Sequence, residues 1–122
     1  MKNDFKGKTG IERLINAISY SLSGFKVAFQ KEEAFRQEIL LTIILVPLAI
    51  YLANNAVETA LLVLSTFLVP IIELVNSAIE ATVDRISIKK HKLSMRAKDI
   101  GSAAVFLSLV NLFTVWLIII FY

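Results

Sequence analysis

The segment TALLVLSTFLVPIIELVNSAIEATVD, residues 59–84, decides the fold class of this chain because it is long and mostly apolar. A transmembrane α-helix needs about 20 apolar residues to cross ~30 Å of hydrocarbon at ~1.5 Å per residue. Five polar residues of the segment fall within roughly a third of the helix circumference, at ~100° per residue. We call them the polar stripe: Glu73, Asn76, Ser77, Glu80 and Asp84. The segment therefore predicts a membrane-spanning helix with one polar face.

Two other apolar stretches predict further membrane spans. The run 39–53 is too short to cross a bilayer alone, so we extend it back through the charged residues before it, to about 32–53. The last span covers about 97–122. The sequence thus predicts an all-α integral membrane protein in which residues 1–122 form a single membrane-embedded domain.

The segment at about 10–30 predicts a helix of a different kind. Apolar residues recur at spacings of three and four from Ile11 to Phe29, and polar and charged residues occupy the opposite face. This pattern is typical of an amphipathic helix that lies in the membrane interface, with its cations among the lipid headgroups. Packing against a protein core is the alternative.

Composition and charge exclude several classes of protein. The chain is 57% hydrophobic and 19% charged, and it contains no cysteine, so a water-soluble domain, a disulfide framework and a thiol site are excluded. Lys and Arg are concentrated before the first span and in the segment 85–98, and the segment 54–58 has none. The positive-inside rule then predicts a cytoplasmic N-terminus and an outward C-terminus. Because the cations cluster at span ends, nucleic acid is not an expected partner.

The polar stripe holds more carboxylates than helix packing requires. An ionisable side chain in a span costs ~2.5 to 3.5 kcal/mol, so several on one face indicate a functional site. Amides and hydroxyls such as Asn76 and Ser77 also suit contacts between helices. Glu73 is predicted to lie ~7 Å below the cytoplasmic boundary, at the depth of a lipid hydroxyl, and Glu80 just above it. Glu73 is therefore a candidate general base, and Glu80 a candidate Mg²⁺ ligand.

Charged residues of the other spans are expected at the same cytoplasmic mouth. Glu32, Glu33 and Glu38 precede the first apolar run, and Lys98 and Asp99 precede the last. Phosphoryl transfer requires metal-held phosphates, a cation and a base, and these residue types are present. The glycines form neither a P-loop nor a GxGxxG motif. The residues alone predict a membrane site that binds a cation.

Three stretches carry a resemblance to a known family: EAFRQE at 33–38, ELVNSAIEATVDRI at 73–86 and RAKDIGSAA at 96–104. They resemble the prokaryotic diacylglycerol kinases, over nearly the whole chain. The resemblance implies a homotrimeric helical bundle in the bacterial inner membrane, with a surface helix and three transmembrane helices in each chain. It also implies an ATP- and Mg²⁺-dependent lipid kinase that converts diacylglycerol to phosphatidic acid in phospholipid metabolism.

The resemblance also implies roles for individual residues. Glu73 would be the catalytic base with Asn76 beside it, and Glu32 and Glu80 would bind magnesium. The residues expected to contact the nucleotide are Arg13, Tyr20, Glu32, Glu80, Lys89, Lys90, His91, Lys98 and Asp99. Those expected to contact the lipid, partly from a neighbouring subunit, are Arg13, Ser21, Ala34, Phe35, Arg36, Gln37, Glu38, Ser102 and Trp116. Lys89 and Lys90 depart from the family, which often has an acidic and an aromatic residue there.

Two alternative functions remain open from the sequence. Undecaprenol kinase would use the same machinery on a polyprenol, although the segment Phe35-Arg36-Gln37-Glu38 favours diacylglycerol. A non-enzymatic scaffold or small cation channel would instead use the polar stripe to line a pore.

Overall fold

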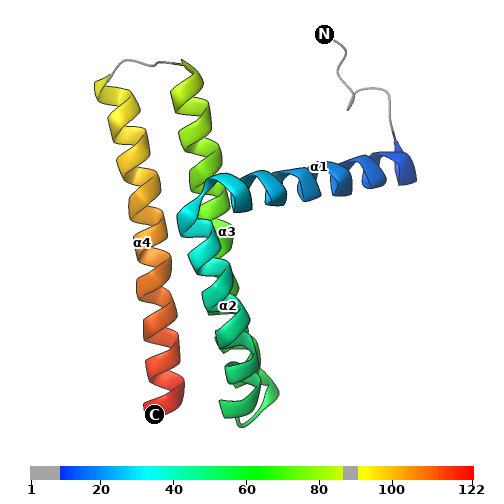
Figure 1. Ribbon diagram of the computed structural model, residues 1–122. Helices are drawn as coiled ribbons and strands as arrows, with labels where there is room; N and C mark the ends of the chain where they lie inside the picture. The colour runs from blue at the N-terminus through cyan, green and yellow to red at the C-terminus, as the bar shows by residue number, and fades with distance from the viewer. Residues whose placement is uncertain (1–8, 87–90) are drawn as a thin grey trace. The chain divides into compact units, whose positions relative to one another are not determined.

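The computed structural model describes residues 9–86 and 91–122, which form four α-helices and no strand (Figure 1). The helices are α1 (Gly10–Lys31), α2 (Glu33–Leu52), α3 (Ala56–Ile86) and α4 (Lys92–Phe121). The all-α prediction is confirmed. The chain divides into two compact units, Met1–Glu32 and Glu33–Tyr122, and each is described by itself.

The first described unit consists of α1. Its large apolar residues are exposed. The helix ends at Lys31, and the backbone N–H of Glu32, its C-cap, donates to the Ala28 carbonyl over 2.9 Å. The exposed large apolar residues of α1 are Ile11, Leu14, Ile15, Ile18, Tyr20, Leu22, Phe25, Val27 and Phe29. A helix with so many exposed apolar side chains requires a partner surface other than water.

The second unit is a bundle of α2, α3 and α4, in which α3 packs against both of the others. Its core consists of small and branched apolar residues together with one indole: Ala49, Leu62, Val69, Leu112 and Trp116. Each of the three helices is long and apolar enough to cross a membrane. The prediction of three such helices is confirmed.

α4 begins earlier than the apolar pattern suggests. It starts at Lys92 rather than near Ala97, because His91 caps it: Nδ1 of the imidazole accepts a hydrogen bond from the Leu93 N–H over 3.1 Å. Hydropathy detects the part of a helix that is apolar, whereas this cap lies in a polar turn. The basic residues Lys92, Arg96 and Lys98 at the start of α4 are therefore helical.

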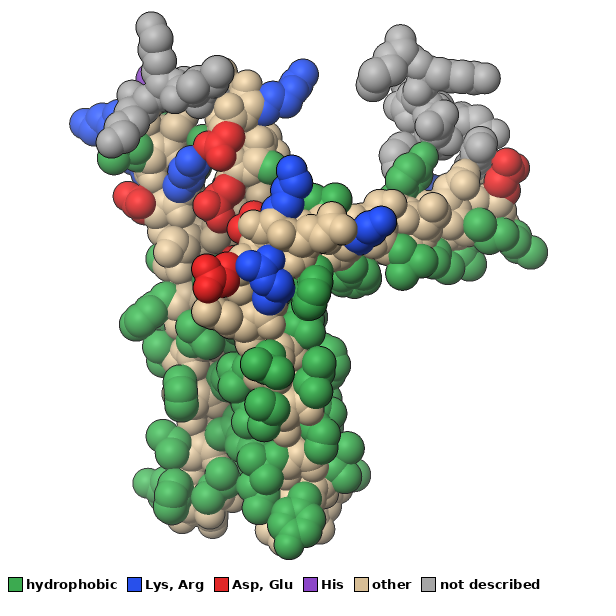
Figure 2. Space-filling model, viewed as in Figure 1, with side chains coloured by type: hydrophobic (Ala, Val, Ile, Leu, Met, Phe, Trp, Pro, Cys, Tyr) green, Lys and Arg blue, Asp and Glu red, His purple; other side chains and the backbone are tan. Residues whose placement is uncertain are grey.

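Polar and apolar side chains separate along the bundle. Figure 2 shows that the charged residues of α2, α3 and α4 gather toward the end where α3 ends and α4 begins, and that hydrophobic side chains cover the opposite end. Exposed apolar residues on that surface include Ile44, Leu64, Phe106 and Phe113. This distribution suits a bundle whose apolar part lies in hydrocarbon and whose charged end reaches the headgroups.

One hydrogen bond between side chains joins α3 to α4 in the apolar core. Nε1 of Trp116 donates to Oγ1 of Thr66 over 3.2 Å, and the Thr66 hydroxyl donates to the Leu62 carbonyl over 2.7 Å. Both side chains are buried. An indole N–H without a partner would be costly at this depth, so the threonine fixes the indole orientation.

Thr66→Val is expected to lower the free energy of unfolding by about 1 to 2 kcal/mol, because it leaves the buried indole N–H without its acceptor. Reversible unfolding in mixed detergent micelles measures the change. Thr114→Val is the matched control, since the Thr114 hydroxyl is exposed and donates only to the Val110 carbonyl of its own helix. Equal effects of the two substitutions would show that the bond to Trp116 contributes nothing.

Candidate functional site

The polar stripe of α3 lies where the bundle packs, and two of its members are almost fully buried. Glu73 is 5% exposed and Asn76 is 8% exposed, although both belong to a helix that is long and apolar enough to span a membrane. Because α3 continues unbroken from Ala56 to Ile86, its geometry holds the stripe on one line. Burying a carboxylate and an amide in such a bundle is costly, so their presence there indicates a functional site.

A carboxylate from α2 approaches this part of α3. Glu38 is half-buried on α2, the helix that packs against α3. Oε2 of Glu38 is buried and accepts no hydrogen bond from any described residue. A buried carboxylate oxygen without a partner is available to accept a hydrogen bond from a bound hydroxyl.

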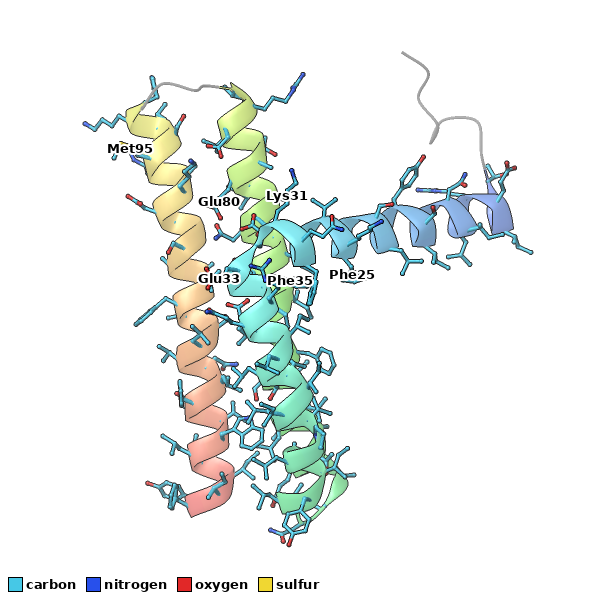
Figure 3. All side chains as sticks on the ribbon, viewed as in Figure 1. Phe25, Lys31, Glu33, Phe35, Glu80 and Met95 are labelled. Carbon is cyan, nitrogen blue, oxygen red and sulfur yellow. The ribbon has the colours of Figure 1, made fainter. Side chains whose placement is uncertain are left out.

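Asn76 links the buried part of the stripe to its wetter end. Nδ2 of Asn76 donates to Oε1 of Glu80 over 3.1 Å. At its other edge the amide carries Oδ1, which is buried without a hydrogen-bond partner among residues 9–86 and 91–122, as is the hydroxyl of Ser77. Glu80 itself is half-buried, and Figure 3 shows it on α3 beside α4. The stripe thus passes from a buried carboxylate through an amide to a carboxylate that solvent can reach.

A cation from α4 reaches the same end of α3. Nζ of Lys98 lies 2.6 Å from Oδ1 of Asp84, and Glu80 lies one helical turn before Asp84 on the same face of α3. Both partners of the ion pair are substantially exposed, so solvent screens it and it adds little to stability. Its consequence is local, because it keeps an ammonium group beside the carboxylates of α3.

Asp99 faces a different hollow. Together with Lys92 and Arg96 it lines an open depression of about 440 Å³ on α4, whose other walls are apolar. No residue of α3 lines this depression. The structure therefore brings Glu38, Glu73, Asn76, Glu80 and Lys98 together, while Asp99 opens onto a neighbouring surface of α4.

The residues predicted to contact the lipid are spread along the bundle. On α2, Phe35 is buried and Ala34, Arg36 and Gln37 are exposed, and on α4 Ser102 is exposed. Trp116 lies further along α4, about 21 Å from Ser102 at ~1.5 Å per residue. It borders a wholly apolar cavity of about 190 Å³ with Leu41, Leu45, Leu112 and Phe113.

The remaining predicted site residues belong to α1 or to the connection before α4. Arg13, Tyr20, Ser21 and Glu32 are in the first unit, where Ser21 donates to its own helix at the Ala17 carbonyl over 2.9 Å. That these four residues belong to the same site as the polar stripe of α3 stays a prediction. Lys89 and Lys90 lie outside the described residues, and His91 is the cap of α4.

One residue that lies against the polar stripe, Gly101, was not among the residues predicted from the sequence. It is buried on α4 directly beside Asn76. The available signal was composition, since Gly101 is the only glycine after residue 24. Glycine is unfavourable inside a helix, so a single one in a long apolar helix indicates close packing.

Comparison with known proteins gives consistent matches. The family model described as prokaryotic diacylglycerol kinase matches residues 19–120. A diacylglycerol kinase of Pseudomonas aeruginosa is 51% identical over 92% of this chain and 91% of its own length. The Escherichia coli K12 diacylglycerol kinase is 45% identical over 91% of each chain. One from Helicobacter pylori is 41% identical over 88% of this chain and 84% of its own.

Proposed function

This chain belongs to the prokaryotic diacylglycerol kinase family, and on that premise we propose that it transfers the γ-phosphate of ATP to diacylglycerol and releases phosphatidic acid. The observation that carries the proposal is a nearly buried carboxylate, Glu73, on a helix that can cross a membrane. A soluble kinase has no need to bury a base in an apolar bundle. An enzyme whose acceptor hydroxyl belongs to a membrane lipid has to place its base at the depth of that hydroxyl.

The proposed step uses residues of the bundle. The lipid hydroxyl oxygen attacks the γ-phosphorus while its proton passes to the Glu73 carboxylate, and the bond from the γ-phosphorus to the bridging oxygen breaks to release ADP. The Lys98 ammonium, already beside Glu80 and Asp84, offsets negative charge that spreads over the phosphates. Oε2 of Glu38, buried without a hydrogen-bond partner among the described residues, is a further acceptor that the lipid hydroxyl could meet.

Magnesium is proposed to bind at Glu80, with Glu32 as the second ligand. The described residues contain no group of three or more His, Cys, Asp or Glu side chains with metal-binding spacing. Magnesium does not require one, because it usually binds one or two carboxylates and completes its shell with water and substrate phosphates. Glu80 fits this role, since it is half-buried and Asn76 orients one of its oxygens. Bound magnesium would neutralise charge on the β- and γ-phosphates.

The membrane placement is proposed from charge and apolar surface. The charged end of the bundle would face the cytoplasm, the bundle would associate as a trimer in the inner membrane, and α1 would lie in the interface with its exposed apolar side chains in the acyl region. Acyl chains would then run along the bundle toward Trp116 and its apolar cavity.

Cysteine accessibility tests the orientation. The chain has no native cysteine, so single cysteines at Asn55 and Lys92 can be labelled without background. A membrane-impermeant maleimide added to spheroplasts should label the Asn55→Cys protein, and should reach the Lys92→Cys protein only after the membrane is opened. Labelling of both from the outside would contradict three crossings.

Acceptor preference tests the function. Purified protein is given γ-labelled ATP with dioleoylglycerol or with undecaprenol, in the same micelles and at the same mole fraction. We expect labelled phosphatidic acid to form much faster than labelled undecaprenyl phosphate. The reverse preference would identify a polyprenol kinase, and no transfer to either lipid, with ion flux through reconstituted vesicles, would identify a channel.

A further inference from the structure

Gly101 occupies a position where a larger residue would improve the helix. It lies well inside α4, far from either end, and its side chain would face α3. Alanine is the stronger helix former at such a position, because glycine loses more conformational freedom when the helix forms. The glycine therefore serves a contact rather than the stability of α4.

That contact is with Asn76. A Cβ added at Gly101 would overlap Oδ1 of Asn76 and lie 3.2 Å from its Cγ, and no other residue comes as close. The Asn76 amide thus fills the space that the missing side chain leaves on α4. Its other edge is directed along α3 to Glu80, where Nδ2 donates over 3.1 Å.

The two edges of the amide are not interchangeable. With Oδ1 against Gly101, the NH₂ group meets the Glu80 carboxylate, which only accepts hydrogen bonds. A reversed amide would set its oxygen against that carboxylate. The Glu80 carboxylate therefore selects the orientation of the amide, and the missing side chain at Gly101 leaves the room that the amide needs to occupy it.

We propose that Gly101 is a positioning residue: because it has no side chain, the Asn76 amide has the room to keep its hydrogen bond to Glu80. This inference rests on the proposed function, in which Glu80 is a magnesium ligand. Partners that orient a ligating carboxylate typically change metal affinity or activity ~10 to 100-fold when they are lost. Gly101 acts on the reaction through Asn76 and need not touch ATP or lipid.

The kinetic test compares Gly101→Ala with Gly24→Ala. Gly24 is also helical, but nothing lies within 4 Å of an added Cβ there, so the same chemical change meets open space. We expect Gly101→Ala to raise the free Mg²⁺ concentration for half-maximal activity ~10-fold or more and to lower kcat up to ~10²-fold. Gly24→Ala should leave the Mg²⁺ half-saturation unchanged. An unaltered Mg²⁺ half-saturation in folded Gly101→Ala would overturn the proposal.

A double-mutant cycle of unfolding temperatures tests the contact between Gly101 and Asn76 without measuring activity. In the wild-type background Gly101→Ala should lower the unfolding temperature, because the new methyl group collides with Asn76. In an Asn76→Ala background the collision is absent, so the same substitution should be neutral or raise the unfolding temperature. An equal loss in both backgrounds would assign Gly101 to general packing of α3 and α4, and would refute the proposal. A wild type without kinase activity would reject the proposed function instead, and the cycle would still decide the contact.

Discussion

Replacing Glu73 with glutamine is expected to lower phosphatidic acid formation by ~10² to 10⁴-fold, the usual range for loss of a general base. Glutamine keeps the size of the side chain and most of its hydrogen-bonding capacity, but it does not accept the proton of the lipid hydroxyl. Because Glu73 is nearly buried, the neutral amide removes a buried charge, and we expect the bundle to remain folded. Turnover and detergent thermal stability are to be measured on the same preparations.

Two further variants separate the role of the carboxylate from its role in packing. Glu73→Asp keeps the charge but shortens the reach by one methylene, so turnover should also fall strongly. Glu58→Gln is the matched control: the same change at the other end of α3, where the carboxylate accepts hydrogen bonds from Asn54 and Asn55. It should retain wild-type turnover. A Glu73→Gln protein with near-normal turnover would remove Glu73 as the base.

The second large effect is expected from Glu80→Gln. An uncharged amide is a poor magnesium ligand, so the Mg²⁺ concentration for half-maximal activity should rise ~10 to 100-fold. Diacylglycerol half-saturation should change much less, because the acceptor hydroxyl is proposed to lie nearer to Glu73. Glu58→Gln, the same change at the other end of α3, is again the matched control and should leave both values unchanged. An unchanged magnesium titration for Glu80→Gln at full activity would exclude Glu80 from the metal site.

The spans and the polar stripe could be predicted because each depends on one helix alone. The length of an apolar run determines whether it crosses a bilayer, and a rotation of ~100° per residue determines that Glu73, Asn76 and Glu80 share a face. The confirmed prediction of three helices long and apolar enough to span a membrane follows from the first rule. The rotation per residue does not determine which neighbouring helix that face contacts.

Contacts between helices follow no sequence period, so the residue pairs that form them could not be predicted. Thr66 and Trp116 are 50 residues apart and form a buried hydrogen bond, yet nothing in either segment marks the pair. Gly101 and Asn76 meet because two helices approach closely at one point. The Lys98 to Asp84 ion pair depends likewise on how α4 packs on α3. The sequence indicated which side chains were unusual in a membrane, and the bundle supplied their partners.

Single-turnover transfer tests the central claim most directly, namely that the buried carboxylate of α3 serves phosphoryl transfer to a lipid hydroxyl. Enzyme in excess over γ-labelled ATP, at saturating magnesium and dioleoylglycerol, isolates the chemical step from product release. We expect the wild type to move the label into phosphatidic acid, and Glu73→Gln to do so ~10² to 10⁴-fold more slowly while binding the same amount of ATP. Equal single-turnover rates for the two proteins, or label released only as inorganic phosphate by the wild type, would contradict this account.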